Sequence, residues 1–582
     1  MPRAEGALLA AAVGDALGWP QEDRGRRVRA PAEAEPRLEF SSWWRREGGR
    51  YAAYEVEIGP GEYSDDTQLM LALAHALRAE DAWWERWTSV ELPFWLLYER
   101  GGGAATKRAA RSWTTGKAPW RQDNPASYFN AGGNGVAMRV LPHCVRGASS
   151  DDFSPIASAV TKDGIATHGH PVALVGALAY AYALWKALRR ERSLDYGELI
   201  ADTRASVSTW SRLPEDLPTE WPETAERHIQ VGYSRLWGMT VEGMVGLLDA
   251  LEGAIGQGSL AFDRETLESL GAFDRQIGGA GTVTAAGALY LASRYASRPA
   301  QGILAGAFSR GADTDTLASM TGGLLGAISG TDWLGGLAAK VQDYEHLRVT
   351  AQDLVAPSDK PTVRPKESTV ARFSRRVAQL RAGDEIPLPD GRVGALTRVR
   401  DLPTKTRHEI KSFVFSTDDG QTLHVTKRRR TKRPGTDSDQ GAEQHRVAET
   451  TSHRRKPRVT FAIEATDLER STRFYRDLIG LEVTRKTTDF VSFGGEIVLF
   501  PTSSYEELPA RQLDLRADGA STSPTKILIF VEPPELDAVR ERIVAADFKV
   551  SPVTTMRSLR RFRCSDPDGT TLEIREANGV PR

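Results

Sequence analysis

An acidic motif at the start of an apolar segment constrains the fold of this chain more than any other feature. Residues 311–316 read Gly-Ala-Asp-Thr-Asp-Thr and precede a run of small and apolar residues at 317–328. A second motif, Ser-Asp-Asp-Thr at 64–67, precedes a similar run at 68–77. Neighbouring carboxylates repel each other unless a cation lies between them. The sequence therefore predicts that the fold brings the two helix starts together around a cation.

Each motif also has a simpler interpretation as a helix N-cap. One Ser or Asp side chain at the start of a helix accepts a hydrogen bond from a free backbone N–H. Capping requires only one such side chain, whereas four polar side chains crowd the turn at 64–67. This crowding favours a metal site, and clusters of hard oxygen ligands suit Mg²⁺ or Mn²⁺ better than zinc.

Segments rich in Ala, Gly and Leu at helical spacing fill residues 1–350, with few alternating strand patterns. The many small residues on these segments indicate close approach of one helix to another. Residues 1–350 are therefore predicted to form one large all-α domain. The predicted helices span residues 6–17, 68–79, 172–188, 241–255, 284–295 and 317–328.

Three further motifs in this domain carry residues suited to ligand binding. Residues 14–22 describe a helix that ends in a loop and delivers Glu22 to a fixed place, or else a C-cap followed by a surface glutamate. The motif Gly-Asn-Gly-x-Ala-Met-Arg at 133–139 lets backbone N–H groups approach a ligand closely. In Thr-His-Gly-His-Pro at 167–171, His168 is expected to contact or position a ligand.

Other residues near these motifs have both a functional and a structural interpretation. Arg139 is either a ligand contact or an ion-pair partner inside the helical bundle. His170 is either half of an HxH metal pair or the cap of a turn. The glycines at 101–103 form either a phosphate-binding loop at a helix start or a flexible turn.

The five motifs, in this order, closely resemble those of the ADP-ribosylglycohydrolase family. The resemblance covers roughly residues 5–335. It implies an orthogonal all-α fold around a binuclear centre of magnesium, or sometimes manganese. The departures are small: Ala312 stands where a second glycine is usual, and Ser64 replaces the commoner threonine.

The resemblance also implies roles for individual residues. Two Mg²⁺ ions would hold the ribose and polarise a water that attacks its anomeric carbon. The catalytic carboxylate that takes the proton of this water would be Glu22, Asp65 or Asp66. The metal ligands would be Ser64, Asp65, Asp66, Asp313, Asp315 and Thr316. The ADP-ribose pocket would be lined by Gly133, Asn134, Gly135 and Met138, with His168 beside the ribose.

The second half of the chain is predicted to begin with a linker at 351–366 and a small β-rich unit at 367–427. This unit is expected to contain a helix at 368–380 and strands within 384–399 and 410–426. A basic linker at 428–457 follows, and its sharpest charge run is residues 427–433. This run either contacts nucleic acid through phosphates or is a solvated linker.

Residues 458–582 contain an internal βαβββ repeat, and its second module is expected to include a strand at 549–553. Together with Asp-Leu-Glu-Arg-Ser at 467–471 and Asp-Pro-Asp-Gly at 566–569, the repeat resembles the glyoxalase/bleomycin-resistance (vicinal-oxygen-chelate) superfamily. Enzymes of that group hold one divalent metal through His and Glu. Residues 458–582 contain no histidine, and Glu573 alone keeps a ligand position. We therefore expect a module that binds a ligand or a partner, or that forms a homo-oligomer, without a metal.

Composition limits the remaining classes of function. With 76 basic and 77 acidic residues, the net charge of -1 gives no overall bias toward nucleic acid or membrane. Two cysteines without CxxC spacing, Cys144 and Cys564, favour a reducing cytoplasm. The apolar stretch at 171–185 is shorter than the roughly 20 residues that a bilayer requires.

The expected function is metal-dependent hydrolysis of the N- or O-glycosidic bond between ADP-ribose and an acceptor, which is a protein or a small molecule. One alternative is an ADP-ribose sensor that binds metal and does not turn over. Another is a hydrolase that acts on ADP-ribosylated nucleic acid. The expected fold class is multidomain: an all-α domain, a small β-rich unit and an α+β domain of paired modules.

Overall fold

The computed structural model describes two compact units, Met1–Thr436 and Asp437–Arg582. The described residues are 2–22, 27–29, 36–48, 53–192, 194–258, 262–356, 369–404, 406, 408–430, 461–465, 467–486, 491–493, 497–501, 529–531, 536–548, 550–556, 559–565, 567 and 571–575.

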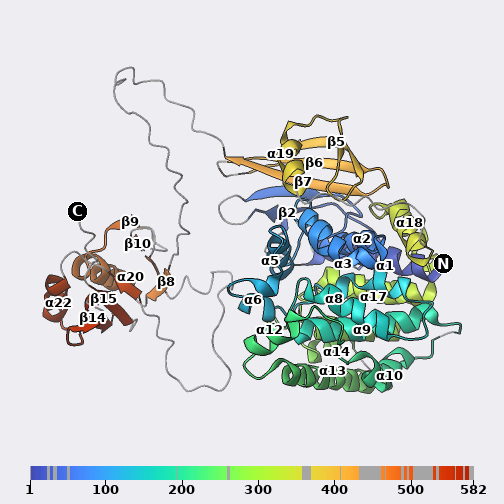
Figure 1. Ribbon diagram of the computed structural model, residues 1–582, viewed down its shortest axis with the longest axis horizontal. Helices are drawn as coiled ribbons and strands as arrows, with labels where there is room; N and C mark the ends of the chain where they lie inside the picture. The colour runs from blue at the N-terminus through green and yellow to red at the C-terminus, as the bar shows by residue number, and fades with distance from the viewer. Residues whose placement is uncertain are drawn as a thin grey trace. The chain divides into compact units, whose positions relative to one another are not determined.

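Helices form the body of the first unit (Figure 1). Its core contains α1 (Pro2–Gly18), α2 (Asp65–Leu77), α9 (Pro171–Arg189), α15 (Gly281–Tyr295) and α17 (Thr314–Ser329). Around them lie α3 (Trp83–Arg86), α4 (Leu92–Trp95), α5 (Ala104–Trp113), α6 (Ala126–Phe129), α7 (Leu141–Arg146), α8 (Ser154–Ile165), α10 (Glu198–Ala205), α11 (Val207–Trp210), α12 (Glu220–His228), α13 (Tyr233–Gly256), α14 (Asp263–Ser269), α16 (Pro299–Ala307) and α18 (Tyr344–Val355).

The backbones of helices α1 and α17 are in contact because glycines occupy the positions where the two helices meet. A Cβ atom added to Gly18 would lie 2.2 Å from the carbonyl oxygen of Thr314. One added to Gly14 would lie 2.2 Å from the carbonyl oxygen of Ala318. No larger residue fits at either position. The close packing predicted from the small residues is thus present, and it brings the end of α1 to the start of α17.

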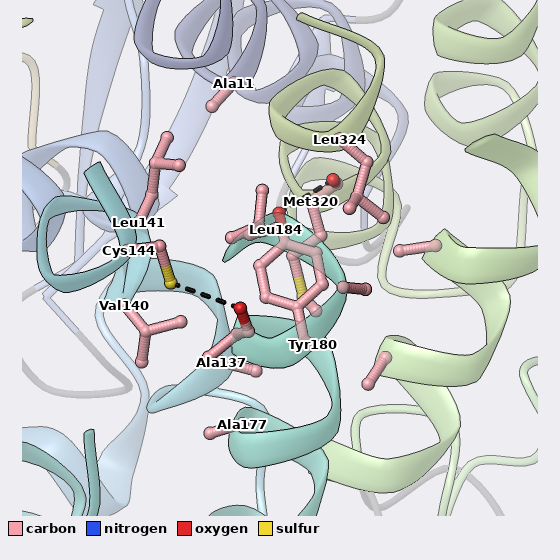
Figure 2. Packing of buried hydrophobic residues seen from close by; sticks show 14 of the residues in the cluster. Ala11, Ala137, Val140, Leu141, Cys144, Ala177, Tyr180, Leu184, Met320 and Leu324 are labelled. Atoms are coloured by element: carbon pink, nitrogen blue, oxygen red, sulfur yellow. Dashed lines mark hydrogen bonds between the residues drawn. The ribbon is translucent and has the colours of Figure 1, made fainter. Parts of the chain in front are cut away.

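Helix α9 lies in the middle of the hydrophobic core and contacts α17 and α7 (Figure 2). The hydroxyl of Tyr180 donates a hydrogen bond to the carbonyl oxygen of Met320 at 2.8 Å. The thiol of Cys144 donates one to the carbonyl oxygen of Ala181 at 3.5 Å. Among the described residues, α9 alone is long and apolar enough to cross a membrane, and 83% of its most apolar window is buried inside the protein. It is the central core helix of this unit.

A three-stranded antiparallel sheet interrupts the helices between α1 and α2. Its strands are β1 (Arg27–Arg29), β2 (Trp43–Glu47) and β3 (Tyr54–Ile58), in that order. This sheet was not predicted, because strand β2 reads Trp-Trp-Arg-Arg-Glu and lacks the simple alternation of apolar and polar residues. The domain is therefore helix-rich rather than purely helical.

A four-stranded antiparallel sheet follows the helices in the same compact unit (Figure 1). Its order is β4 (Glu385–Pro387), β5 (Val393–Asp401), β6 (His408–Thr417) and β7 (Thr422–Arg430), and α19 (Thr369–Arg376) packs on it. We call residues 369–430 the accessory sheet. Strand β7 extends to Arg430, so it includes three residues that the sequence analysis assigned to the basic linker; residues 431–433 of the charge run lie outside the described residues.

The accessory sheet shares a hydrophobic cluster with the helices. Phe94 of α4 packs against Phe373 of α19, with ring centroids 5.6 Å apart. Trp87 and Phe415 belong to the same buried cluster. Backbone pairing adds to this contact, since the amide of Glu55 on β3 donates to the carbonyl oxygen of Pro403 at 2.9 Å.

The second unit contains two sheets of four strands with the same topology. The first sheet has the order β8 (Phe461–Ala465), β11 (Ile497–Pro501), β10 (Val491–Phe493) and β9 (Val483–Lys486). The second has the order β12 (Ile529–Val531), β15 (Thr571–Arg575), β14 (Leu559–Ser565) and β13 (Thr554–Met556). In each sheet the first two strands are parallel and the others antiparallel.

Helices α20 (Leu468–Arg473) and α22 (Leu536–Ala545) complete the two modules. The predicted internal βαβββ repeat is therefore confirmed. One strand was placed wrongly, because β13 begins at Thr554 whereas the sequence indicated 549–553. The side chain of Glu573 lies outside the described residues, so the remaining ligand position of this unit stays a prediction.

Candidate active site

The start of α2 is held by a carboxylate from α1. Asp15 is buried, and its Oδ1 accepts a hydrogen bond from the backbone amide of Ser64 at 3.0 Å. Its Oδ2 accepts from the amide and the hydroxyl of Thr67 at 3.0 and 2.6 Å. Asp15 thus satisfies backbone donors that the first turn of a helix leaves free. Asp15 lies in the motif at 14–22, which by itself does not indicate this role.

With Asp15 in this position, the side chains of the 64–67 motif are arranged around the start of α2. The Ser64 hydroxyl caps the helix by accepting from the amide of Asp66 at 3.3 Å. The hydroxyl of Thr316 on α17 donates to Asp66 Oδ1, also at 3.3 Å. The two acidic motifs therefore meet, as the sequence predicted.

Glu22 reaches the same place from the turn that follows α1. One carboxylate oxygen from each of Glu22, Asp313 and Asp315 lies within 4.8 Å of the others. Asp313 is oriented by Asn134, whose side-chain amide donates to its Oδ2 at 2.9 Å. The turn after α1 and the start of α17 thus supply these three carboxylates, the start of α2 adds Asp66 beside them, and Asn134 from a fourth segment orients Asp313.

Burial and mutual repulsion act on the carboxylates of this cluster. The pKa of Asp65 is raised well above its ordinary value by burial and by the charges of Glu99 and Asp15. Burial and neighbouring carboxylates likewise raise the pKa of Asp66 and the pKa of Asp315. A helix N-terminus, by contrast, lowers the pKa of a nearby carboxylate and favours its charged form. In the protein without a cation, burial and like charges outweigh that effect.

The donor set fits a divalent ion. Asp66 Oδ2 is buried and has no hydrogen-bond donor among the described residues. A buried carboxylate oxygen without a donor is costly unless a cation binds it. Carboxylate and hydroxyl oxygens are the ligands that Mg²⁺ and Mn²⁺ prefer. The residues present therefore suit the group that the sequence analysis expected.

The glycine loop at 132–135 lies beside the cluster. The amide of Asn134 donates to the carbonyl oxygen of Gly279 at 2.9 Å. A Cβ atom added to Gly135 would lie 3.0 Å from Cε1 of His168, so loop and imidazole are in direct contact. Burial, followed by the charges of Arg139 and Arg108, lowers the pKa of His168 to about 3, which leaves its ring neutral.

Several neighbouring residues turn out to be structural. Arg139 and Asp163 form a fully buried ion pair at 3.0 Å, so Arg139 is the ion-pair partner inside the bundle. His170 caps α9 by accepting from the amide of Val172 at 3.2 Å. Met138 belongs to a buried hydrophobic cluster, and its contact with a substrate stays a prediction.

A second group of potential metal ligands, His75, Glu91 and Asp390, joins α2 to the accessory sheet. His75 Nδ1 lies 3.0 Å from Glu91 Oε1. Glu91 also pairs with Arg86 at 2.9 Å, and Asp390 pairs with Arg392 at 2.6 Å. Because two guanidinium groups already neutralise these carboxylates, this group is an ion-pair network of the interface.

Two family models match this chain, and the range of one of them includes Asp66 and Asp315. The family model of ADP-ribosylglycohydrolase matches residues 1–363, which is more than half of the chain. The chain belongs to the ADP-ribosylglycohydrolase family. Within this family member, a second family model, the Glyoxalase/Bleomycin resistance protein/Dioxygenase superfamily, matches residues 459–574.

Solved structures give weaker likenesses to this ADP-ribosylglycohydrolase family member. A structure described as an ADP-ribosylglycohydrolase-related protein complex is 22% identical, with 61% of this chain and 96% of that chain covered and a TM-score of 0.37. A lactoylglutathione lyase from Agrobacterium tumefaciens is 22% identical over 22% of this chain and 96% of its own, with a TM-score of 0.17. No curated protein matches the chain.

Proposed function

We propose that this protein is a magnesium-dependent hydrolase that releases ADP-ribose from an acceptor. The observation that carries the proposal is the meeting of two acidic motifs, with Asp66 Oδ2 buried and lacking a donor among the described residues. Family membership supports a glycohydrolase activity. Two Mg²⁺ ions, or Mn²⁺, would be held by Ser64, Asp65, Asp66, Asp313, Asp315 and Thr316.

When bound, such ions would lower the pKa of a water and stabilise charge on the ribose oxygens. The residues of the chain position the reaction. The contact between Thr316 and Asp66 sets the separation of the two motifs. Asn134 orients Asp313, and Asp15 holds the turn that carries Asp65.

Glu22 is proposed as the general base. It lies within 4.8 Å of Asp313 and Asp315, and it follows a short 3-10 turn, Trp19–Gln21, rather than standing inside a helix. It would take the proton of the attacking water as the glycosidic bond to the acceptor breaks. The ribose would lie between this carboxylate cluster and His168.

The ADP-ribose pocket is proposed to extend along Gly133, Asn134 and Gly135 to His168. The absence of a Cβ atom at Gly135 allows its contact with the imidazole. His168 Nδ1 is hydrogen-bonded to the Thr167 hydroxyl at 2.7 Å. This contact orients the neutral ring so that Nε2 is on the side of the glycine loop.

The decisive experiment is ADP-ribose release from a panel of ADP-ribosylated acceptors, with Mg²⁺ or with EDTA. We expect ADP-ribose release to require Mg²⁺. The rate of release should fall by roughly a thousandfold or more in Asp315→Asn, which keeps the shape of the side chain. Asp249→Asn, on the exposed face of α13, is the matched control and should retain full activity. If the wild type binds ADP-ribose with Mg²⁺ and releases none, the protein is a sensor and the hydrolase proposal is wrong.

A further inference from the structure

Arg45 places a buried positive charge beside the carboxylate cluster. It lies on β2, in the sheet between α1 and α2, and its side chain is 1% exposed. A Cβ atom added to Gly101 would lie 2.8 Å from Arg45 Nη1 and 3.1 Å from Asp65 Oδ1. The guanidinium and the carboxylate therefore approach each other across a glycine that has no side chain to separate them.

The position of Arg45 is fixed by two contacts. Its Nε pairs with Glu47 Oε1 at 3.0 Å. Its guanidinium carbon lies 5.1 Å from the centre of the Trp19 ring, which stands three residues before Glu22. The two terminal nitrogens, Nη1 and Nη2, are buried and have no hydrogen-bond acceptor in the described parts of the chain.

The charges that face this guanidinium are mostly those of the site. They come from Glu47 on the same strand, Glu22 after α1, Asp65 on α2 and Asp315 on α17. Arg100 lies on the same tryptophan ring, 5.3 Å from its centre, but its charge is paired with Glu62 at 2.7 Å. Of these two arginines, Arg100 forms its ion pair through a terminal nitrogen, Nη2, whereas Arg45 forms its ion pair through Nε.

We propose that the positive charge of Arg45 weakens the binding of divalent ions at this site. In the absence of metal, its charge partly compensates the clustered carboxylates and stabilises the fold. When a divalent ion binds, the two positive charges repel each other at short range in a medium of low polarity. Arg45 therefore sets the Mg²⁺ concentration at which the site fills. This inference rests on the proposed metal centre.

The test compares Arg45→Met, which keeps the apolar stem, with Arg45→Lys, which keeps the charge. Affinity for Mg²⁺ is measured by titration calorimetry with magnesium chloride, and thermal stability is measured in EDTA. We expect Arg45→Met to bind Mg²⁺ about tenfold more tightly and to unfold at a lower temperature in EDTA. Arg45→Lys should keep the wild-type affinity within about twofold.

Two further variants separate charge from packing. Arg100→Met removes the other guanidinium from the Trp19 ring and should leave Mg²⁺ affinity unchanged. Glu47→Gln leaves the charge of Arg45 without its partner and should weaken Mg²⁺ binding about threefold; the Glu47 side chain is 29% exposed, so this variant is expected to fold.

The outcomes distinguish this inference from the proposed function. Equal affinities in the wild type, Arg45→Met and Glu47→Gln would overturn the role of Arg45 and leave the metal centre intact. If Arg45→Met does not fold, an unchanged affinity in Glu47→Gln is enough to reject the role. A wild type that binds no Mg²⁺ would overturn both proposals.

Discussion

Asp15 Oδ2 accepts a hydrogen bond of 2.6 Å from the hydroxyl of Thr67, and this contact ties α1 to the first turn of α2. The same carboxylate accepts from two backbone amides of that turn. A residue that is not among the proposed metal ligands therefore determines where Asp65 and Asp66 stand.

Replacing Asp15 with Asn should separate this positioning from metal binding itself. The amide offers one acceptor oxygen in place of two, and its NH₂ group faces donors. We expect the free energy of unfolding to fall by about 2–3 kcal/mol and Mg²⁺ affinity to fall with it. Thr67→Val, which removes one of the three hydrogen bonds, should cost about 1 kcal/mol. Denaturant unfolding measures the free energy of unfolding, and calorimetry measures the Mg²⁺ affinity. Wild-type values of both in Asp15→Asn would contradict the positioning role of Asp15.

Gly18→Ala should disturb the site through helix packing. The added Cβ atom would lie 2.2 Å from the carbonyl oxygen of Thr314 and would push α1 from α17. We expect a loss of about 3 kcal/mol in the free energy of unfolding, together with weaker metal binding. Gly238→Ala on α13 is the control, since nothing lies within 4 Å of its Cβ position. That substitution should stabilise the helix by about 0.5–1 kcal/mol, and equal effects of the two would refute the packing argument.

The loss of stability with rising pH should disappear on metal loading. Asp65, Asp66 and Asp315 have folded-state pKa values above the ordinary 3.8. The folded protein without metal therefore binds more protons than the unfolded chain. Its free energy of unfolding falls as pH rises from 3.8 through the raised pKa values of these groups. With Mg²⁺ in place of the protons, this loss should disappear. Melting temperatures from about pH 5 to about pH 8, in EDTA and in Mg²⁺, should diverge as pH rises; parallel curves would count against a metal at these carboxylates.

Shortening the chain should have opposite results at two positions. A chain that ends at residue 436 keeps the whole first unit and should unfold at the wild-type temperature of that unit. A chain that ends at residue 356 lacks the accessory sheet. The loss of the sheet exposes Trp87 and Phe94, and it removes Asp390 from the network with His75 and Glu91. We expect the second protein to aggregate or to be strongly destabilised, as measured by gel filtration and calorimetry. A stable, monomeric 1–356 protein would show that the sheet is dispensable.

Local patterns predicted the parts of the site that depend on one segment at a time. The apolar runs after 64–67 and 311–316 are helices α2 and α17, because helix periodicity is a short-range property. Three elements were missed or misplaced for the opposite reason. The β1–β3 sheet lacks a simple alternating pattern, β13 is short, and the last residues of β7 are charged and join the sheet only by pairing with β6.

The sequence by itself determined the acidic motifs, their place at helix starts and the small residues that allow close packing, since these depend on residue type and spacing. Only the tertiary structure decided which charges meet. Asp15 on α1 holds the start of α2, and Arg45 from an unforeseen sheet faces Asp65 across Gly101. Electrostatic interactions act through space between segments that are distant in the chain, so their partners are known only once packing has brought those segments together.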